Sequence, residues 1–264
     1  MPHVLPDRAA IARIRLRNRI ETALTLAALG LLAGAIGFLA AGIEGLVIGA
    51  VMAALGLSLG AMPADAVFRR GFGAAPLSPF QAPGLSALVQ ELARRAGLAS
   101  VPRLYLLPQP VLQAVAAGTT ERAGIGVTRA LVEVLPAEEL AAVLAHEVSH
   151  VRHGDLTVMR IAASASGITR AMAQAGLLVL ILWGTGAFGA HPLLPVLLIL
   201  APVVSDLLAL SLSRAREFLA DAGAAELTGD PAALAAALRR LQALQGDDFE
   251  RLASRGPRWL RWFR

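Results

Sequence analysis

The sequence contains no cysteine and no lysine, and these absences narrow the chemistry that the chain can perform. All 24 basic residues of the 264-residue chain are arginines. Without cysteine the protein can form neither disulfides nor thiolate ligands for zinc, and it has no cysteine nucleophile. Charged residues make up only 16% of the chain and hydrophobic residues 56%, which is rare in a soluble enzyme of this size. The composition therefore predicts a membrane protein whose polar chemistry uses no thiol.

The first apolar residues form two uncharged segments near the N-terminus. They cover 22–41 and 45–62, and a short loop around Glu44 separates them. About 20 apolar residues are enough for a helix to cross a bilayer. We therefore expect two transmembrane helices here. The length of the first segment, with the second close behind it, favours a signal anchor over a cleaved signal peptide.

A second apolar pair occupies the last third of the chain. It covers about 171–190 and 193–212, with a break at His191-Pro192 and with Asp206 inside the second segment. These lengths predict two more membrane helices, for about four in total. The proline and the aspartate keep buried core helices open as an alternative. Asp206 itself could line a pore or pair two helices.

Arginine placement predicts the orientation of these segments. The loops at 41–44 and 189–192 contain no arginine. The arginines that flank the first pair are Arg8, Arg13, Arg15, Arg17, Arg19, Arg69 and Arg70. By the positive-inside rule, both termini and the segment 63–170 face the cytoplasm, as in a multi-pass protein of the inner or plasma membrane. The net charge of +5 then reflects membrane-flanking arginine, and no basic stripe with interleaved aromatics indicates a specific nucleic-acid partner.

Residues 146–150, His-Glu-Val-Ser-His, place two imidazoles and a carboxylate on one short segment. Residues four apart on an α-helix are roughly 40° apart around the axis and about 6 Å apart along it, so His146 and His150 can hold one metal ion. Glu147 then lies beside the metal, where it can take a proton from bound water. A proline and two glutamates at 136–139 favour a helix start ahead of the motif. The alternative is a helix that carries two incidental histidines.

A hydrolytic zinc site also needs a third protein ligand and an open position for water. His153 is three residues past His150 and points partly off the metal face, so we expect a polar neighbour of the site or a surface residue. The better candidate is on the predicted helix 213–221, where Glu217 and Asp221 are four residues apart. Glu217 would ligate the metal, and Asp221 would accept the free N–H of a ligand histidine. A solvated helix face is the alternative for this carboxylate pair.

The tetrahedral oxyanion of peptide hydrolysis needs a donor in addition to the metal. Arg214, Arg216 and His153 are the candidates, and the sequence does not choose among them. Arg216 could instead pair with Asp155 or Asp221, which is the simpler interpretation.

Two stretches together resemble one family, the HtpX-type membrane zinc metalloproteases, which are related to the CAAX prenyl proteases. They are 146–155, HEVSHVRHGD, and 213–221, SRAREFLAD. The resemblance covers most of the chain and implies one Zn²⁺ per chain, polypeptide substrates and the quality control of misfolded or membrane proteins. The zinc ligands and the catalytic base that it implies are His146, His150, Glu217 and Glu147.

The expected fold is a mainly α integral membrane protein of about four transmembrane helices, with a cytoplasmic zincin-like α+β catalytic domain and a small β-hairpin or sheet. We divide the chain into an N-terminal basic segment with two spans, a catalytic segment, a transmembrane hairpin, and a third-ligand helix with the C-terminal helix and tail. The corresponding ranges are 1–62, 63–170, 171–212 and 213–264. Short strands are expected at 103–107, 113–117 and 124–127, and helices at 85–96 and from Asp230-Pro231 to about Leu244.

The substrate peptide is expected to lie extended along an edge strand of the 113–127 hairpin, held by main-chain hydrogen bonds. The strand residues proposed to contact it are Gln113, Ala114, Val115, Ala116 and Ala117. Family members usually carry an Asn-Ala-Phe run here, whereas this chain has Gln-Ala-Val. The departure affects the substrate contacts and leaves the metal ligands unchanged.

The C-terminal residues alternate arginine with aromatic or aliphatic residues. This pattern predicts an anchor in the headgroup layer of the cytoplasmic face, with a frayed tail as the alternative and less support for non-specific RNA contact. The residues are Arg255, Arg258, Trp259, Leu260, Arg261, Trp262, Phe263 and Arg264.

Three functions remain open from the sequence: an active membrane endoprotease, a CAAX-type processing peptidase, and a non-catalytic scaffold with a protease-like fold. Four spans are few for the large intramembrane chamber of the second. The presence of Glu147 and Glu217 argues against the third. The sequence does not indicate the oligomeric state.

Overall fold

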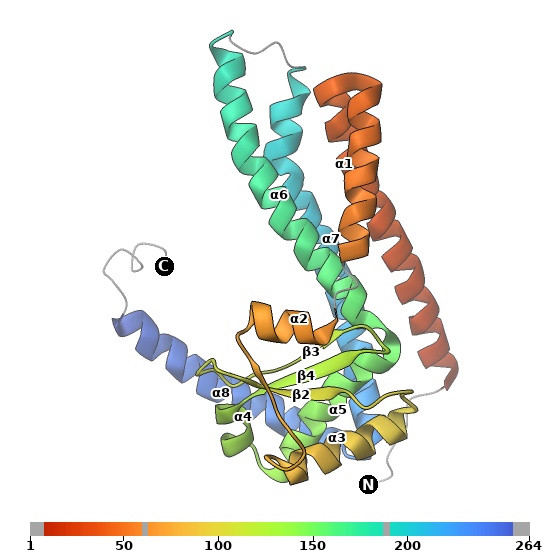
Figure 1. Ribbon diagram of the computed structural model, residues 1–264, viewed down its shortest axis with the longest axis vertical. Helices are drawn as coiled ribbons and strands as arrows, with labels where there is room; N and C mark the ends of the chain where they lie inside the picture. Colours follow the sequence, from red (N-terminus) through yellow and green to blue (C-terminus); the bar gives the residue numbers. More distant parts are fainter. Residues whose placement is uncertain (1–7, 60–62, 187–190, 256–264) are drawn as a thin grey trace. The chain divides into compact units, whose positions relative to one another are not determined.

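The computed structural model describes three stretches of the chain, residues 8–59, 63–186 and 191–255 (Figure 1). They form two compact units. The α/β unit contains the described residues of 63–153 and 220–255. The helical unit contains those of 8–59 and 154–219. Helix α7 (Leu193–Thr228) is continuous through the boundary between them.

A small mixed sheet forms the centre of the α/β unit. Its strands are β1 (Ala75–Pro76), β2 (Arg103–Leu107), β3 (Ala114–Gly118) and β4 (Ala123–Thr128), in the order β1-β2-β4-β3. β2 and β4 are parallel, and the two outer pairings are antiparallel. The hairpin predicted from the sequence is the β3–β4 pair, and β3 is an edge strand of the sheet.

Helices cover one face of this sheet (Figure 1). They are α3 (Pro83–Ala96), α4 (Arg129–Val134), α5 (Ala137–His153), α8 (Pro231–Arg255) and the last turns of α7. Ile125 and Val127 of β4 are fully buried against them, together with Leu144 and Val148 of α5. The hydrophobic effect therefore holds α5 against the sheet next to β3.

The opposite face of the sheet packs on α2 (Ala64–Ala66) and a π-helical turn, η1 (Val67–Gly71). Phe68 of η1 stacks on Tyr105 with ring centroids 4.6 Å apart. Gly124 and Gly126 make room for these rings, because a Cβ at Gly124 would be 2.7 Å from Cε2 of Tyr105. β1, α2 and η1 were not predicted from the sequence, because all three are too short to show a hydrophobic period.

Two predicted helix boundaries are confirmed in the α/β unit. Gly97 ends α3 in the left-handed region, with φ of 68°. Asp230 caps α8, because its Oδ1 accepts hydrogen bonds from the N–H groups of Ala232 and Ala233 at 2.9 and 3.2 Å. Helix α8 runs to Arg255, beyond the predicted end near Leu244. The tail at 256–264, predicted as an interfacial anchor, lies outside the described residues.

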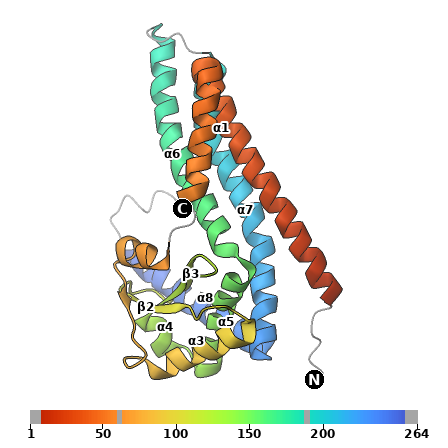
Figure 2. The ribbon, with the colours of Figure 1, turned by 45° about the vertical axis from the view of Figure 1, so that its right-hand side comes forward.

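The helical unit contains α1 (Arg8–Leu59), α6 (Asp155–Gly184) and α7 up to residue 219. α1 bends at Ala41 and Gly42, where Gly42 has φ of 61°. Figure 2 shows its two arms side by side and antiparallel. Glycines allow this close packing, since a Cβ at Gly45 would overlap the carbonyl of Gly37.

Three helices of the described chain are long and apolar enough to cross a membrane: Leu16–Leu55, Ala165–Gly184 and Leu193–Leu210. The first, of 40 residues, holds the first predicted segment, 22–41, and residues 45–55 of the second, which was predicted to reach residue 62. Asp206 lies in the third and pairs with Arg170 of the second, with 3.5 Å between Nη2 and Oδ2. Of the two roles considered for Asp206, helix pairing is the one observed.

The packing of the α1 arms generates a prediction for Gly45. Replacing Gly45 with Ala should destabilise the detergent-solubilised protein by about 1–3 kcal/mol, because the new methyl group overlaps the backbone of the other arm. Gly30→Ala is the matched control, since a Cβ there meets no atom within 4 Å. Thermal unfolding of both variants measures the difference. Equal stability of the two variants would show that the arms do not pack at this position.

Candidate metal centre

Helix α5 brings the two histidines of the HEVSH segment to one face. The imidazole rings of His146 and His150 are edge to face, with centroids 4.8 Å apart. Their Nε2 atoms are 3.2 Å apart. Two nitrogens bound at about 2.05 Å to one tetrahedral zinc ion would be about 3.3 Å apart. The two nitrogens therefore have the separation that a shared metal ion requires.

Asp221 orients the first of these rings. Its Oδ1 is 3.0 Å from Nδ1 of His146. A carboxylate can only accept, so this bond places the ring proton on Nδ1 and leaves the Nε2 lone pair of His146 available. The interaction that the sequence predicted for Asp221 is thus present, between α5 and the last turns of α7.

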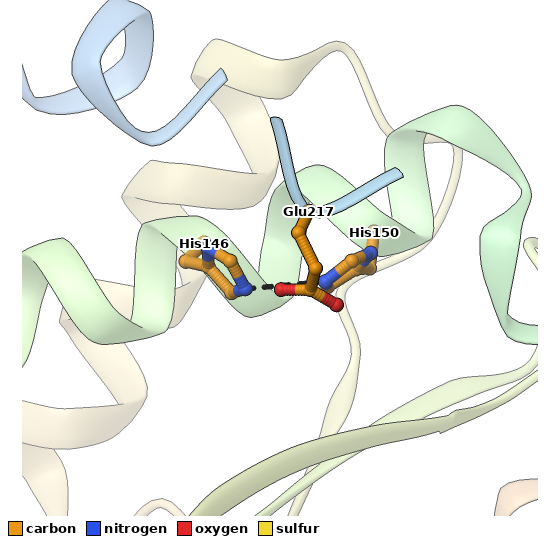
Figure 3. Close-up of side chains that lie close together, drawn as sticks. All are labelled: His146, His150 and Glu217. Atoms are coloured by element: carbon orange, nitrogen blue, oxygen red, sulfur yellow. Dashed lines mark hydrogen bonds between the residues drawn. The ribbon is translucent and has the colours of Figure 1, made fainter. Parts of the chain in front are cut away.

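Glu217 lies one helical turn before Asp221 on α7. Ligand atoms of His146, His150 and Glu217, one from each residue, all lie within 4.8 Å of one another. Figure 3 shows the Glu217 carboxylate pointing toward the two imidazoles. Two imidazoles and a carboxylate form a donor set typical of catalytic zinc sites, so these three side chains could hold a metal ion.

Glu147 follows His146 directly on α5, and its side chain contacts the edge of the sheet. Its Oε2 accepts a hydrogen bond of 2.6 Å from the N–H of Ala116 in β3. The opposite edge of β3 faces β4. There the carbonyl of Gln113 accepts a hydrogen bond from the N–H of Thr128, and Val115 and Ala117, two and four residues after Gln113, also pair with β4. Backbone N–H groups point to alternate sides of a strand from one residue to the next. The N–H groups of Ala114 and Ala116 therefore point away from β4.

Arg216 and Asp155 form a buried ion pair within the helical unit. Nη1 of Arg216 donates to Oδ1 of Asp155, and the two side chains are 6% and 4% exposed. Nη2 of Arg216 donates to the hydroxyl of Thr22 on α1 at 2.6 Å. The pairing of Arg216 with Asp155, which the sequence left as the alternative to an oxyanion donor, is confirmed. The side chain of Arg214 lies outside the described part of the structure.

His153 lies outside the group of His146, His150 and Glu217. Its Nδ1 is 3.2 Å from Oγ of Ser149, one helical turn earlier on α5. Its side chain thus contacts the neighbouring turn of α5.

A bidentate ion pair fixes the start of α5. Arg240 of α8 donates to both carboxylate oxygens of Glu139 at 2.8 and 2.9 Å. The hydrogen bonds and the positive charge of Arg240 lower the pKa of Glu139. This pair joins α5 to α8 at the end of α5 away from His150.

Two neighbours of the site, Ser149 and Gly223, were not predicted from the sequence, nor was Thr22 as a partner of Arg216. Gly223 is buried and lies against Ser149, where a Cβ would overlap the serine hydroxyl. The sequence did contain a signal for Gly223. A glycine inside a predicted helix costs about 1 kcal/mol relative to alanine and usually indicates close packing. Thr22 gave no comparable signal within its apolar segment.

Comparison with known proteins gives an independent result. The model of peptidase family M48 matches residues 79–261. The protease HtpX homolog of Nostoc punctiforme is 39% identical over 235 residues, which are 86% of this chain and 80% of the relative. The protease HtpX homolog of Acaryochloris marina is 41% identical over 234 residues, with 86% and 78% covered. That of Acidiphilium cryptum is 37% identical over 243 residues, with 89% and 83% covered. No solved structure matches the chain.

These similarities cover both halves of the candidate metal centre and most of the apolar helices. They agree with the resemblance carried by the segments 146–155 and 213–221. The chain therefore belongs to peptidase family M48 and is a membrane-bound metalloprotease of the HtpX type.

Proposed function

We propose that His146, His150 and Glu217 hold one zinc ion and that the protein is a zinc endopeptidase of misfolded and membrane proteins. The main support is the 3.2 Å separation of the two Nε2 atoms, with Asp221 fixing the tautomer of His146. When bound, zinc supplies Lewis-acid polarisation of the scissile carbonyl and lowers the pKa of a water molecule. The absence of cysteine and the mixed nitrogen and oxygen donors favour zinc over softer metals.

Glu147 is the proposed general base and acid. It follows His146 directly on α5, and its carboxylate is held by the N–H of Ala116 at 2.6 Å. It would accept a proton from the attacking water and later deliver it to the leaving amine. This hydrogen bond fixes the position of the carboxylate beside the edge of β3.

The substrate is proposed to add to the outer edge of β3. The N–H of Ala114 points to this edge, and the carboxylate of Glu147 lies along the same edge at Ala116. An extended peptide that pairs there through its main chain would pass the metal group with little dependence on its side chains. Such binding suits a protease that removes misfolded proteins of many sequences.

The two arms of α1 together with α6 and α7 are proposed to make four membrane crossings. Arginines on both sides of the α1 hairpin and none in its turn support a cytoplasmic α/β unit, with the protein in the inner or plasma membrane. The names of the relatives, protease HtpX homologs, support a quality-control protease over a CAAX-type processing peptidase.

Replacing Glu147 with Gln should lower casein cleavage by the detergent-purified protein about 100- to 10,000-fold, because the proton acceptor is lost. Zinc, quantified in the same samples, should remain at one ion per chain. Glu138→Gln is the matched control, since Glu138 is exposed at the start of the same helix and should leave both values unchanged.

Three results would contradict parts of this proposal. Wild-type protein that binds no zinc would exclude the site of His146, His150 and Glu217. Zinc without cleavage in wild type would favour a scaffold or a narrow processing peptidase. Full cleavage by the Glu147→Gln variant would exclude Glu147 as the base.

Replacing Ala114 with Pro should lower kcat/KM for an unfolded polypeptide about tenfold, because one N–H at the edge of β3 is lost. Bound zinc and thermal stability should change little, since proline is tolerated at the first residue of a strand. Val115→Pro is the comparison variant and should lower stability as well, because the main chain of Val115 pairs with β4. Unchanged cleavage by Ala114→Pro would exclude this edge as the substrate site.

A further inference from the structure

We propose that Gly223 is a positioning residue of the metal centre, because its missing side chain sets how closely α7 approaches α5. Gly223 faces Ser149, which lies on α5 between His146 and His150. The inference rests on the proposed metal ligands and adds to them a backbone position that touches neither metal nor substrate.

The contact at Gly223 leaves no room for a methyl group. A Cβ built there would overlap Oγ of Ser149 and lie 2.9 Å from its Cβ. Ser149 is fully buried, and its hydroxyl is 3.2 Å from Nδ1 of His153. The serine therefore cannot turn aside without losing this hydrogen bond, so any larger residue at 223 must push α7 away from α5.

A displacement of α7 at Gly223 would also move the residues of the metal centre that α7 carries. Asp221 lies two residues before Gly223 on α7, and Glu217 lies six residues before it. The bond between Asp221 and Nδ1 of His146 is 3.0 Å long, and a shift of about 1 Å would take it beyond hydrogen-bonding distance. His146 would then lose the partner that fixes its tautomer, and Glu217 would move off its ligand position.

The distances around Gly223 allow a graded test. Gly223→Ala should weaken zinc binding about 10- to 100-fold, the range found when the partner of a ligand histidine is lost. Adding Ser149→Ala removes the overlap with the hydroxyl and should restore part of the affinity. The rescue should be incomplete, because the remaining Cβ contact of 2.9 Å is still too close. Adding Ser149→Gly should restore most of it, because the nearest remaining neighbour is then Cε1 of His153 at 3.6 Å.

The measurement is competition for zinc between the detergent-solubilised full chain and a chelating indicator, with casein cleavage and thermal unfolding in parallel. Ser149→Gly alone shows the effect of a second helix-weakening change. Gly84→Ala is the control for the Gly-to-Ala exchange, since a Cβ at Gly84 of α3 meets nothing within 4 Å.

Rescue separates positioning from general destabilisation. If Gly223→Ala only weakened the fold, the double variant with Ser149→Gly would be less stable and bind zinc no better than the single variant. That result, or wild-type affinity in Gly223→Ala, would overturn the proposal. If Gly223→Ala does not fold, recovery of folding and zinc binding in the double variant supports the proposal, and failure to recover them rejects it. Wild-type protein without zinc affinity would instead reject the metal site.

Discussion

The hydrogen bond between His146 and Asp221 requires α7 to lie directly against α5, and the rest of the candidate metal centre depends on that approach. The bond selects the tautomer that leaves Nε2 of His146 facing Nε2 of His150. Helix α7 also carries Glu217, one turn before Asp221. Although 66 residues separate the second histidine from Glu217 in the sequence, their ligand atoms lie within 4.8 Å of one another.

Each helix of this pair is fixed by interactions of its own. Helix α5 is held by the apolar core beneath the sheet and by the ion pair of Glu139 with Arg240. Helix α7 is held by Arg216, which lies five residues before Asp221, forms a buried ion pair with Asp155 and donates a hydrogen bond to Thr22. Removing one member of a buried pair costs about 3–5 kcal/mol, so this pair stabilises α7 within the helical unit.

Most of the candidate metal centre could be predicted from the sequence because its signals are local. His146 and His150 are four residues apart, as are Glu217 and Asp221, and helical geometry alone places each pair on one face. The strands at 103–107 and 113–117 were also predicted from their composition and flanking turns.

The remaining features depend on contacts between distant segments. The parallel pairing of β2 with β4 places a later strand between two earlier ones, and no local pattern specifies it. The bond of Glu147 to Ala116 and the contact of Gly223 with Ser149 likewise arise only when the elements pack. For Arg216 the sequence allowed two roles, and the buried position of Asp155 decided between them.

X-ray absorption at the zinc edge, on zinc-loaded wild-type protein, tests the central claim most directly. The account predicts a first shell of nitrogen and oxygen at about 2.0–2.1 Å with two imidazoles, from His146 and His150, and a carboxylate. A shell with three imidazoles, which would bring in a further histidine such as His153, or with one imidazole or none, would contradict it.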